Sequence, residues 1–342
     1  MPRIREIHAA AVDVPLTEPF AIAGGAPAVA RNVFVRVIFN DPDNPDDRTG
    51  YGEAAPFEAV SGETQASTLA AIARVTPSLI GREAGDWRAL RPLMPAEPAA
   101  RCALEQALCD VSLGSGIHRL KTDITIPAGS VEHAVAAARR AAAAGFDTVK
   151  IKAGAAGWET DAARVRAIHA AEPALRLIVD ANCGYDLREA RAFLGALHEV
   201  QLELFEQPVP AAALDDLAAL TADAAICADE SVRGPADAKR VADLGVAAIN
   251  VKLMKCGVAD ALEVIAIARA ARIPCMIGGM IETPLSMSYS AALAAAEPGL
   301  FRYVDLDTPL FMPPGVVDAP LTYDGPNLTL RPGRPDAARW FP

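Results

Sequence analysis

Two lysines, Lys150 and Lys152, close the apolar stretch "TVKIKAG" at residues 148–154. Successive side chains of a β-strand point to opposite faces, so the two ammonium groups would share one face. A free lysine has a pKa of about 10.4 and is a poor base at neutral pH because it is almost fully protonated. A second ammonium group and a nearby divalent cation both disfavour the charged form and lower that pKa. We therefore expect Lys152 to act as a base, while Lys150 lowers the pKa of Lys152 and binds an anionic intermediate.

Three acidic residues, Asp180, Glu206 and Asp229, end three successive apolar segments further along the chain. If these segments are neighbouring parallel strands, their carboxylates converge on one side of the mouth of a barrel. Carboxylates without histidine or thiolate make a hard oxygen site that suits Mg²⁺ and leaves positions for water or substrate. The five histidines fall outside the expected strand ends, which argues against zinc or non-haem iron and against histidine as the base. The pattern predicts a Mg²⁺ site.

A third lysine, Lys252, follows the sixth apolar segment, "AINVKLM". The second and sixth strands of an eight-stranded barrel lie opposite each other, so Lys152 and Lys252 would face each other across the site. This arrangement suits removal of a proton from one face of a carbon and delivery of a proton to the other face, which inverts its configuration. A metal that holds the adjacent carboxylate acidifies the carbon by neutralising the charge of the enediolate. The lysines therefore predict a two-base proton transfer.

Short apolar segments alternate with alanine-rich helical segments from about Lys121 onward. This rhythm is typical of a parallel barrel, because parallel neighbours need crossover helices. We expect eight strands with the sequences "TDITIPAG", "TVKIKAG", "LRLIVDAN", "LELFEQP", "AAICADES", "AINVKLM", "IPCMIGGM" and "FRYVDLDT".

The first hundred or so residues differ from the barrel pattern. The segment "NVFVRVIF" at 32–39 alternates with period two, and helical stretches follow from about residue 63 to 115. Strands first and helices afterwards indicate a separate α+β unit. The expected fold is α/β, a modified (β/α) barrel with an N-terminal α+β capping domain. We expect the capping domain at 1–118, the catalytic barrel at 119–315, and a C-terminal segment at 316–342 that packs back on the capping domain.

The composition excludes several classes of function. The 342-residue chain has a formal net charge of -11 and no basic run, which argues against nucleic acid as a partner. No segment reaches the 18 or so uninterrupted apolar residues of a membrane span, and the N-terminus lacks the apolar stretch of a signal peptide. The six cysteines show no C-x-x-C spacing and are expected to be reduced, buried thiols. We expect a cytoplasmic protein without a membrane partner.

A set of short motifs is specific in combination: "KIK", "VDAN", "FEQP", "ADES", "NVKLMKCG" and "GGMIET". With these motifs the chain resembles the enolase superfamily, in its muconate-lactonising subgroup and, within that, the dipeptide epimerases. The resemblance covers nearly the whole chain. It implies one Mg²⁺ per active site and two acid/base lysines, on the residues Asp180, Glu206, Asp229, Lys152 and Lys252. The family places its catalytic lysine first in "KLMK", which favours Lys252 over Lys255, and Glu230 is expected to support the site from outside the metal ligands.

The segment "DLDTP" at 305–309 narrows the function. In dipeptide epimerases a D-x-D at the end of the last strand receives the α-ammonium group of the substrate, and two carboxylates suit that cation. The resemblance therefore implies that Asp305 and Asp307 bind substrate, together with Lys150 and a hydroxyl at Thr125. The alternative for Asp307 is an N-cap of a following helix.

The loop "FAIAGGAPAVAR" departs from the family pattern. This loop covers the substrate side chains in the family, and members that act on Ala-Glu carry an arginine where this chain has Gly24. Without that cation we expect a preference for non-acidic or hydrophobic dipeptides, unless Arg31 replaces the missing arginine.

Three functions remain open from the sequence. The leading hypothesis is a Mg²⁺-dependent L,D-dipeptide epimerase. The alternative is an o-succinylbenzoate synthase, an N-acylamino acid racemase or a cycloisomerase on the same scaffold. A non-catalytic relative that binds metal or ligand is the third, although binding needs no pair of opposed bases. The number of subunits, including a homo-oligomer, is also left open.

Overall fold

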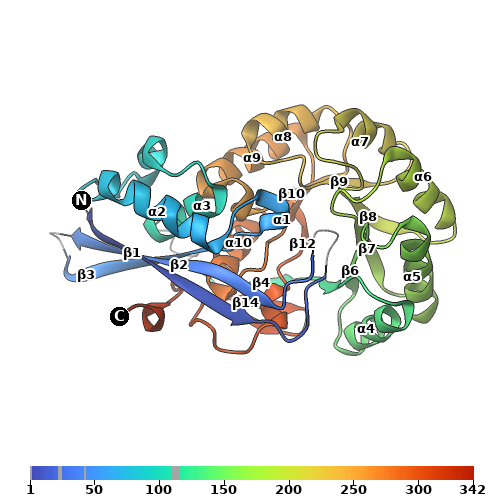
Figure 1. Ribbon diagram of the computed structural model, residues 1–342, viewed down its shortest axis with the longest axis horizontal. Coiled ribbons are helices and arrows are strands. Elements are labelled where there is room, and N and C mark those ends of the chain that lie inside the picture. The colour runs from blue at the N-terminus through green and yellow to red at the C-terminus, as the bar shows by residue number, and fades with distance from the viewer. Residues whose placement is uncertain (1, 22–24, 42–43, 110–115) are drawn as a thin grey trace.

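The computed structural model describes residues 2–21, 25–41, 44–109 and 116–342. Figure 1 shows a blue sheet with helices on one side of the molecule and a curved sheet ringed by helices on the other. Within these residues, no helix is both long and apolar enough to cross a bilayer.

The N-terminal unit is an antiparallel sheet covered by helices, as the alternating pattern predicted. Its strands are paired in the order β1-β2-β3. The elements are β1 (Arg3–Pro15), β2 (Val29–Asp41), β3 (Asn44–Ala54), α1 (Glu58–Ser61), α2 (Gln65–Leu79), the 3-10 helix η1 (Trp87–Leu93) and α3 (Pro98–Leu108). In β3, a Cβ at Gly50 or Gly52 would lie 1.9 or 2.0 Å from a backbone carbonyl of α3. These glycines allow the helix to pack directly on the strand.

The predicted eight-stranded parallel sheet is confirmed. Its order is β12-β11-β10-β9-β8-β7-β6-β5, and each neighbouring pair is parallel. The strands are β5 (Ile124–Ile126), β6 (Thr148–Lys152), β7 (Arg176–Asp180), β8 (Leu202–Glu206), β9 (Ile226–Ala228), β10 (Ala248–Val251), β11 (Cys275–Ile277) and β12 (Phe301–Val304). At the two ends of the sheet, the amide of Asp123 donates to the carbonyl of Val304 at 3.0 Å, which brings β5 beside β12.

Helices cover the outside of this sheet (Figure 1). They are α4 (Val131–Ala143), α5 (Trp158–Ala171), α6 (Leu187–Ala196), α7 (Leu214–Leu220), α8 (Pro235–Ala242), α9 (Gly257–Ala271) and α10 (Pro284–Ala296). After β10 comes the 3-10 helix η2 (Leu253–Lys255), and β12 is followed by the 3-10 helix η3 (Thr308–Phe311) in place of an α-helix. The barrel is therefore a modified one, as expected.

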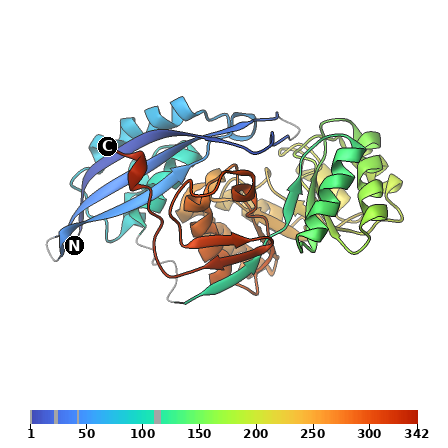
Figure 2. The ribbon, with the colours of Figure 1, turned by 90° about the horizontal axis from the view of Figure 1, so that it is seen from below.

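A third sheet joins the segment before the barrel to the segment after it. Its strands are β4 (His118–Lys121), β13 (Leu321–Asp324) and β14 (Asn327–Leu330), in the order β13-β14-β4. The chain then returns to the N-terminal sheet through the 3-10 helix η4 (Ala338–Trp340) (Figure 2). Trp340 meets Phe34 of β2 edge to face, with ring centroids 5.9 Å apart. The boundaries at 118 and 315 stay predictions.

Candidate active site

The three predicted metal ligands come together at the C-terminal edge of the barrel. Asp180 ends β7, Glu206 ends β8, and Asp229 directly follows β9. One carboxylate oxygen from each residue lies within 4.8 Å of the others, and all three residues are buried. Because parallel strands end at the same edge of a sheet, three residues far apart in the sequence become neighbours.

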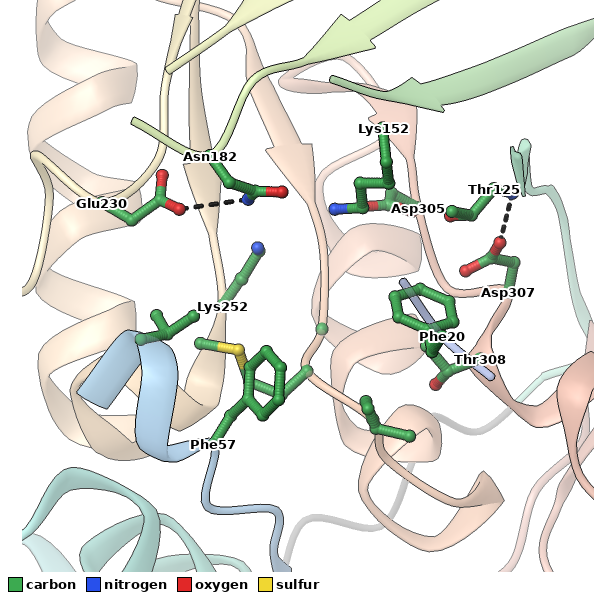
Figure 3. Close-up of a pocket in the computed structure, with 14 residues that line it drawn as sticks. Phe20, Phe57, Thr125, Lys152, Asn182, Glu230, Lys252, Asp305, Asp307 and Thr308 are labelled. Carbon is green, nitrogen blue, oxygen red and sulfur yellow. Dashed lines mark hydrogen bonds between the residues drawn. The ribbon is translucent and has the colours of Figure 1, made fainter. Parts of the chain in front are cut away.

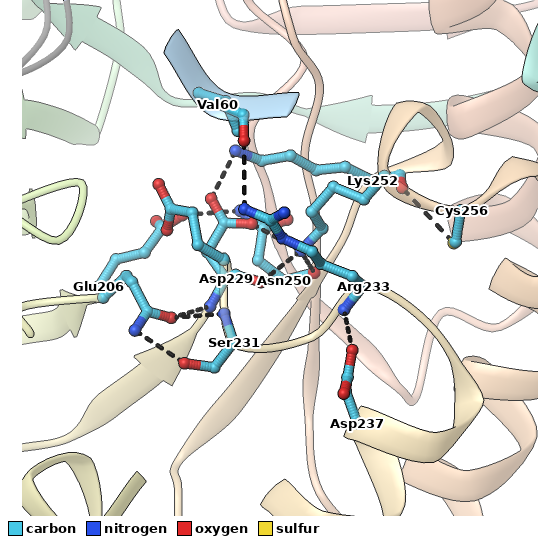
Figure 4. Close-up of polar contacts among 12 residues, drawn as sticks. Val60, Glu206, Asp229, Ser231, Arg233, Asp237, Asn250, Lys252 and Cys256 are labelled. Atoms are coloured by element: carbon cyan, nitrogen blue, oxygen red, sulfur yellow. Dashed lines mark hydrogen bonds and ion pairs between the residues drawn. The ribbon is translucent and has the colours of Figure 1, made fainter. Parts of the chain in front are cut away.

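Each of these carboxylates has one oxygen held by a nearby donor. The amide of Asn182 donates to Asp180 Oδ1 at 3.0 Å, and Lys255 Nζ donates to Asp229 Oδ1 at 2.6 Å. Asn250 Nδ2 donates to Glu206 Oε1 at 2.8 Å (Figure 4). The second oxygen of Glu206 is buried and lies 2.9 Å from the ammonium group of Lys150. Burial, followed by the charge of Asp180, raises the pKa of Glu206 to about 8. A buried set of three carboxylates with converging oxygens fits a hard divalent cation such as Mg²⁺.

Lys150 and Lys152 both reach the carboxylate of Asp180. Their Nζ atoms lie 3.1 Å and 2.7 Å from Asp180 Oδ2. Lys150 Nζ also lies 2.9 Å from Glu206 Oε2 and 2.7 Å from Asp305 Oδ2. Burial by itself lowers the pKa of Lys150, but Asp305, Glu206 and Asp180 outweigh it and hold that pKa well above the usual range. Nearby carboxylates thus compensate the repulsion expected between the two lysines, and Lys150 is a buried cation at the centre of an anionic cluster.

Lys252 follows β10, three strands beyond the metal-ligand strand β7 and on the other side of the site from β6. Its Nζ lies 2.6 Å from Asp229 Oδ2. Figure 3 shows Lys152 and Lys252 directed into one pocket, and both line it. The alternative lysine, Lys255, donates to Asp229 Oδ1, to the carbonyl of Asp229 and to the carbonyl of Asn250. All three of its N–H groups are thereby engaged, so Lys252 is the better placed of the two for proton transfer.

A buried arginine behind β6 holds the backbone of Lys152. Arg164 is fully buried on α5, and its Nη2 donates to the carbonyl of Lys152 at 2.5 Å. Its Nη1 donates to Asp161 Oδ1 at 3.1 Å, and Asp161 Oδ2 accepts the amide of Gly154 at 2.8 Å. This pair was not predicted from the sequence, although its i,i+3 spacing on a helix was an available signal.

Asp305 and Asp307 follow β12 and also line the pocket. Asp307 precedes η3, yet its side chain makes no cap hydrogen bond to that helix. Instead Asp307 Oδ2 accepts the backbone amide of Thr125 at 2.5 Å (Figure 3). Burial, and then the charge of Asp305, raises the pKa of Asp307 to about 7. The geometry therefore disfavours a capping role for the Asp307 side chain. Thr125, expected to contact the substrate through its hydroxyl, lines the same pocket.

The rest of the pocket lining is largely apolar. We use the term apolar wall for five residues that come from the N-terminal unit and from the segment after β11: Phe20, Phe57, Val60, Met280 and Ile281. The opposite lining includes Asn182 and Glu230, joined by a hydrogen bond of 3.1 Å. The buried atoms Asn182 Oδ1 and Glu230 Oε2 accept no hydrogen bond from the residues that the structure describes. Phe57 and Val60 were not predicted from the sequence, whereas the motif "GGMIET" at 278–283 contains Met280 and Ile281.

The cations that line this pocket, among the described residues, are the two lysines. Gly24, where the family pattern has an arginine, lies outside the described residues. Arg31 is exposed and lines a neighbouring cavity that shares Phe57 and Ile281 with the pocket. Arg31 thus does not itself line the pocket between the lysines.

Comparison with known proteins identifies a matching family model and a similar relative. Residues 133–335 match the family model described as enolase C-terminal domain-like. The chain is 47% identical over 329 residues to the aromatic dipeptide epimerase of Herpetosiphon aurantiacus, with 90% of this chain and 91% of the relative covered.

Two solved structures are similar over almost the whole chain. The substrate-liganded L-Ala-D/L-Glu epimerase of Bacillus subtilis has a TM-score of 0.90 and 32% identity, and 97% of this chain and 98% of that chain are covered. The dipeptide epimerase of Enterococcus faecalis V583, complexed with Mg and L-Leu-L-Tyr, has a TM-score of 0.88 and 33% identity, with the same coverage of 97% and 98%.

Proposed function

Since the chain belongs to the enolase superfamily and, within it, to the dipeptide epimerases, we propose that it is a Mg²⁺-dependent L,D-dipeptide epimerase. It inverts an α-carbon of a dipeptide by a two-base 1,1-proton transfer through an enediolate. The observation that carries the proposal is the pair Lys152 and Lys252, which line one pocket from strands on opposite sides of the site. A protein that merely bound a dipeptide would not need two lysines on opposite sides of its site.

Asp180, Glu206 and Asp229 would hold one Mg²⁺. When bound, the ion neutralises charge that develops on the substrate carboxylate and so makes the adjacent carbon more acidic. The support in this chain is the buried oxygen donor set, in which one oxygen from each of the three carboxylates lies within 4.8 Å of the others. The Enterococcus faecalis relative was crystallised with Mg, which is consistent with this assignment.

The two lysines divide the proton transfer between the faces of the α-carbon. One Nζ begins as a neutral amine and accepts the α-proton, while the other begins as an ammonium group and donates a proton to the opposite face. Lys150, fixed among carboxylates by contacts of 2.7 to 3.1 Å, supplies a permanent positive charge near the developing anion. Arg164 fixes the backbone of Lys152 through its carbonyl.

Asp305 and Asp307 would receive the α-ammonium group of the dipeptide. Both carboxyl groups line the pocket from the end of β12. Asp305 is partly neutralised by Lys150 at 2.7 Å, whereas Asp307 is anchored through the amide of Thr125. An acylated amine would present no cation here and would leave a buried carboxylate without its partner.

The apolar wall favours a hydrophobic or aromatic side chain on the substrate. It offers two phenyl rings, one methionine and two branched aliphatic side chains to the pocket. Aromatic and aliphatic side chains gain free energy in such surroundings, while a buried carboxylate without a cation loses it. The relative from Herpetosiphon aurantiacus, an aromatic dipeptide epimerase, supports the same class of substrate.

We expect the protein to epimerise L-Ala-L-Phe and L-Ala-L-Leu with a kcat/KM about tenfold or more above that for L-Ala-L-Glu, because the pocket lining that the structure describes offers no further cation to pair with the glutamate side chain.

N-acetyl-L-Ala-L-Phe is expected to react about 10- to 100-fold more slowly than the free dipeptide, since Asp305 and Asp307 then have no α-ammonium group to bind. Chiral chromatography of each reaction measures both values. Faster turnover of L-Ala-L-Glu would contradict the substrate class, and a preference for the acetylated compound would support an N-acylamino acid racemase instead.

A further inference from the structure

A buried carboxylate of the N-terminal sheet holds the segment that carries part of the apolar wall. Glu53 lies in β3 and is fully buried. Its Oε1 accepts the backbone amide of Thr283 at 2.9 Å, and its Oε2 accepts the Thr283 hydroxyl at 2.7 Å and the amide of Ser286 at 3.1 Å. Thr283 is the N-cap residue of barrel helix α10, and Ser286 lies in the first turn of that helix. Glu53 therefore caps a helix of the other unit, where the positive end of the helix dipole favours a carboxylate.

Asn32 of β2 adds a second link to the same segment. Its Nδ2 donates to Glu53 Oε1 at 2.7 Å and to the carbonyl of Ile281 at 2.9 Å. The Glu53 carboxylate thus accepts four hydrogen bonds in a buried environment, and the carbonyl of a pocket-lining residue is tied to the same network. Removing one partner of a buried, fully bonded charge is costly, so the arrangement strongly restricts where residues 278–283 can lie.

Two hydrogen bonds of Glu282 further fix the segment 278–283. Glu282 Oε1 accepts the amide of Met280 at 2.8 Å, and the Glu282 carbonyl accepts the Thr308 hydroxyl at 2.9 Å. Met280 and Ile281 of this segment, and Thr308, all line the pocket between the lysines. The backbone position of this segment therefore sets the distance between the catalytic lysines and the part of the apolar wall formed by Met280 and Ile281.

We propose that Glu53, together with Asn32, is a positioning residue that determines which substrate side chains fit the pocket. The inference rests on the proposed dipeptide epimerase function and adds specificity determinants that do not touch the substrate. Glu53 and Asn32 are absent from the pocket lining and act through Thr283 and Ile281.

Glu105 provides a matched control. It is a buried glutamate of α3 in the N-terminal unit, and its Oε2 accepts the amide of Ala259 at 3.0 Å near the start of barrel helix α9. Glu105 therefore joins the same two units by the same chemistry. It has no hydrogen bond to the segment 278–283 among the described residues, and it does not line the pocket.

The test compares Glu53→Gln, Asn32→Ala and Glu105→Gln by the ratio of kcat/KM for L-Ala-L-Phe to that for L-Ala-L-Ala. Glutamine at 53 keeps the shape of glutamate but replaces one acceptor oxygen with a donor, which faces other donors. We expect both Glu53→Gln and Asn32→Ala to lower the ratio about tenfold, mainly through KM for the bulky substrate, and Glu105→Gln to leave it unchanged. Amide hydrogen exchange at residues 278–283 is expected to be faster in the first two variants alone.

An unchanged ratio and unchanged exchange in a folded Glu53→Gln variant would overturn the inference, and so would an equal fall in Glu105→Gln. If Glu53→Gln does not fold by circular dichroism, Asn32→Ala decides the matter by the same two measurements. If the unmodified protein turns over no dipeptide, the proposed function fails, while the hydrogen-exchange comparison still tests the link between Glu53 and this segment.

Discussion

Lys252→Ala and Lys152→Ala are each expected to lower kcat for epimerisation by about 10²- to 10⁴-fold, the usual contribution of a positioned acid or base. The two variants should also differ from each other. Each lysine reaches one face of the α-carbon, so each variant keeps one functional base. Lys252→Ala should still exchange the α-proton of one epimer with solvent, and Lys152→Ala should exchange that of the other epimer.

Proton NMR in D₂O measures this exchange on the separate L,L and L,D dipeptides. Lys121→Ala is a suitable control, because Lys121 lies in β4 with its side chain 60% exposed and paired with Asp147. Loss of exchange from the same epimer in both variants would contradict the placement of the two lysines on opposite faces of the α-carbon. Full activity in either variant would remove that lysine from the mechanism.

Removal of Mg²⁺ by a chelator is expected to reduce turnover to background, and added Mg²⁺ to restore it. The α-carbon beside an ionised carboxylate is a very weak acid, and the lysines alone cannot neutralise the charge that forms next to it. Glu206→Gln is expected to weaken Mg²⁺ binding by about 10- to 100-fold, since it replaces one charged ligand of the three-carboxylate site with a neutral amide.

Isothermal titration with Mg²⁺ and turnover of L-Ala-L-Phe measure the two effects separately. Asp147→Asn removes an acidic residue whose side chain is 49% exposed and paired with Arg176, and serves as the matched control. Activity that survives chelation, or a Glu206→Gln variant with normal Mg²⁺ affinity, would exclude these three carboxylates as the metal site.

The barrel and the convergence of its polar residues could be predicted from the sequence because both follow from local pattern. Apolar strands alternate with helices, and parallel strands end at the same edge, so Asp180, Glu206 and Asp229 had to meet once the strands were identified. The roles of the metal ligands and the lysines themselves stay predictions until the variants are measured.

The surroundings of Lys150 could not be predicted in the same way. Its contact with Asp305 joins residues 155 positions apart, so the sequence around "KIK" suggested repulsion from Lys152 without the compensating carboxylates. The link between Glu53 and Thr283 spans 230 positions and joins two units. Contacts of this kind depend on how the units pack together, which neither periodicity nor a short motif encodes.

The central claim is that the protein moves an α-proton of a dipeptide without any other change in bonding. The most direct measurement is mass spectrometry of L-Ala-L-Phe incubated in D₂O with the protein and Mg²⁺, with separation of the epimers. We predict that the inverted epimer carries one solvent deuterium at the α-carbon and retains the dipeptide skeleton. A product that has lost water, or an unlabelled dipeptide with no inverted epimer, would contradict the claim.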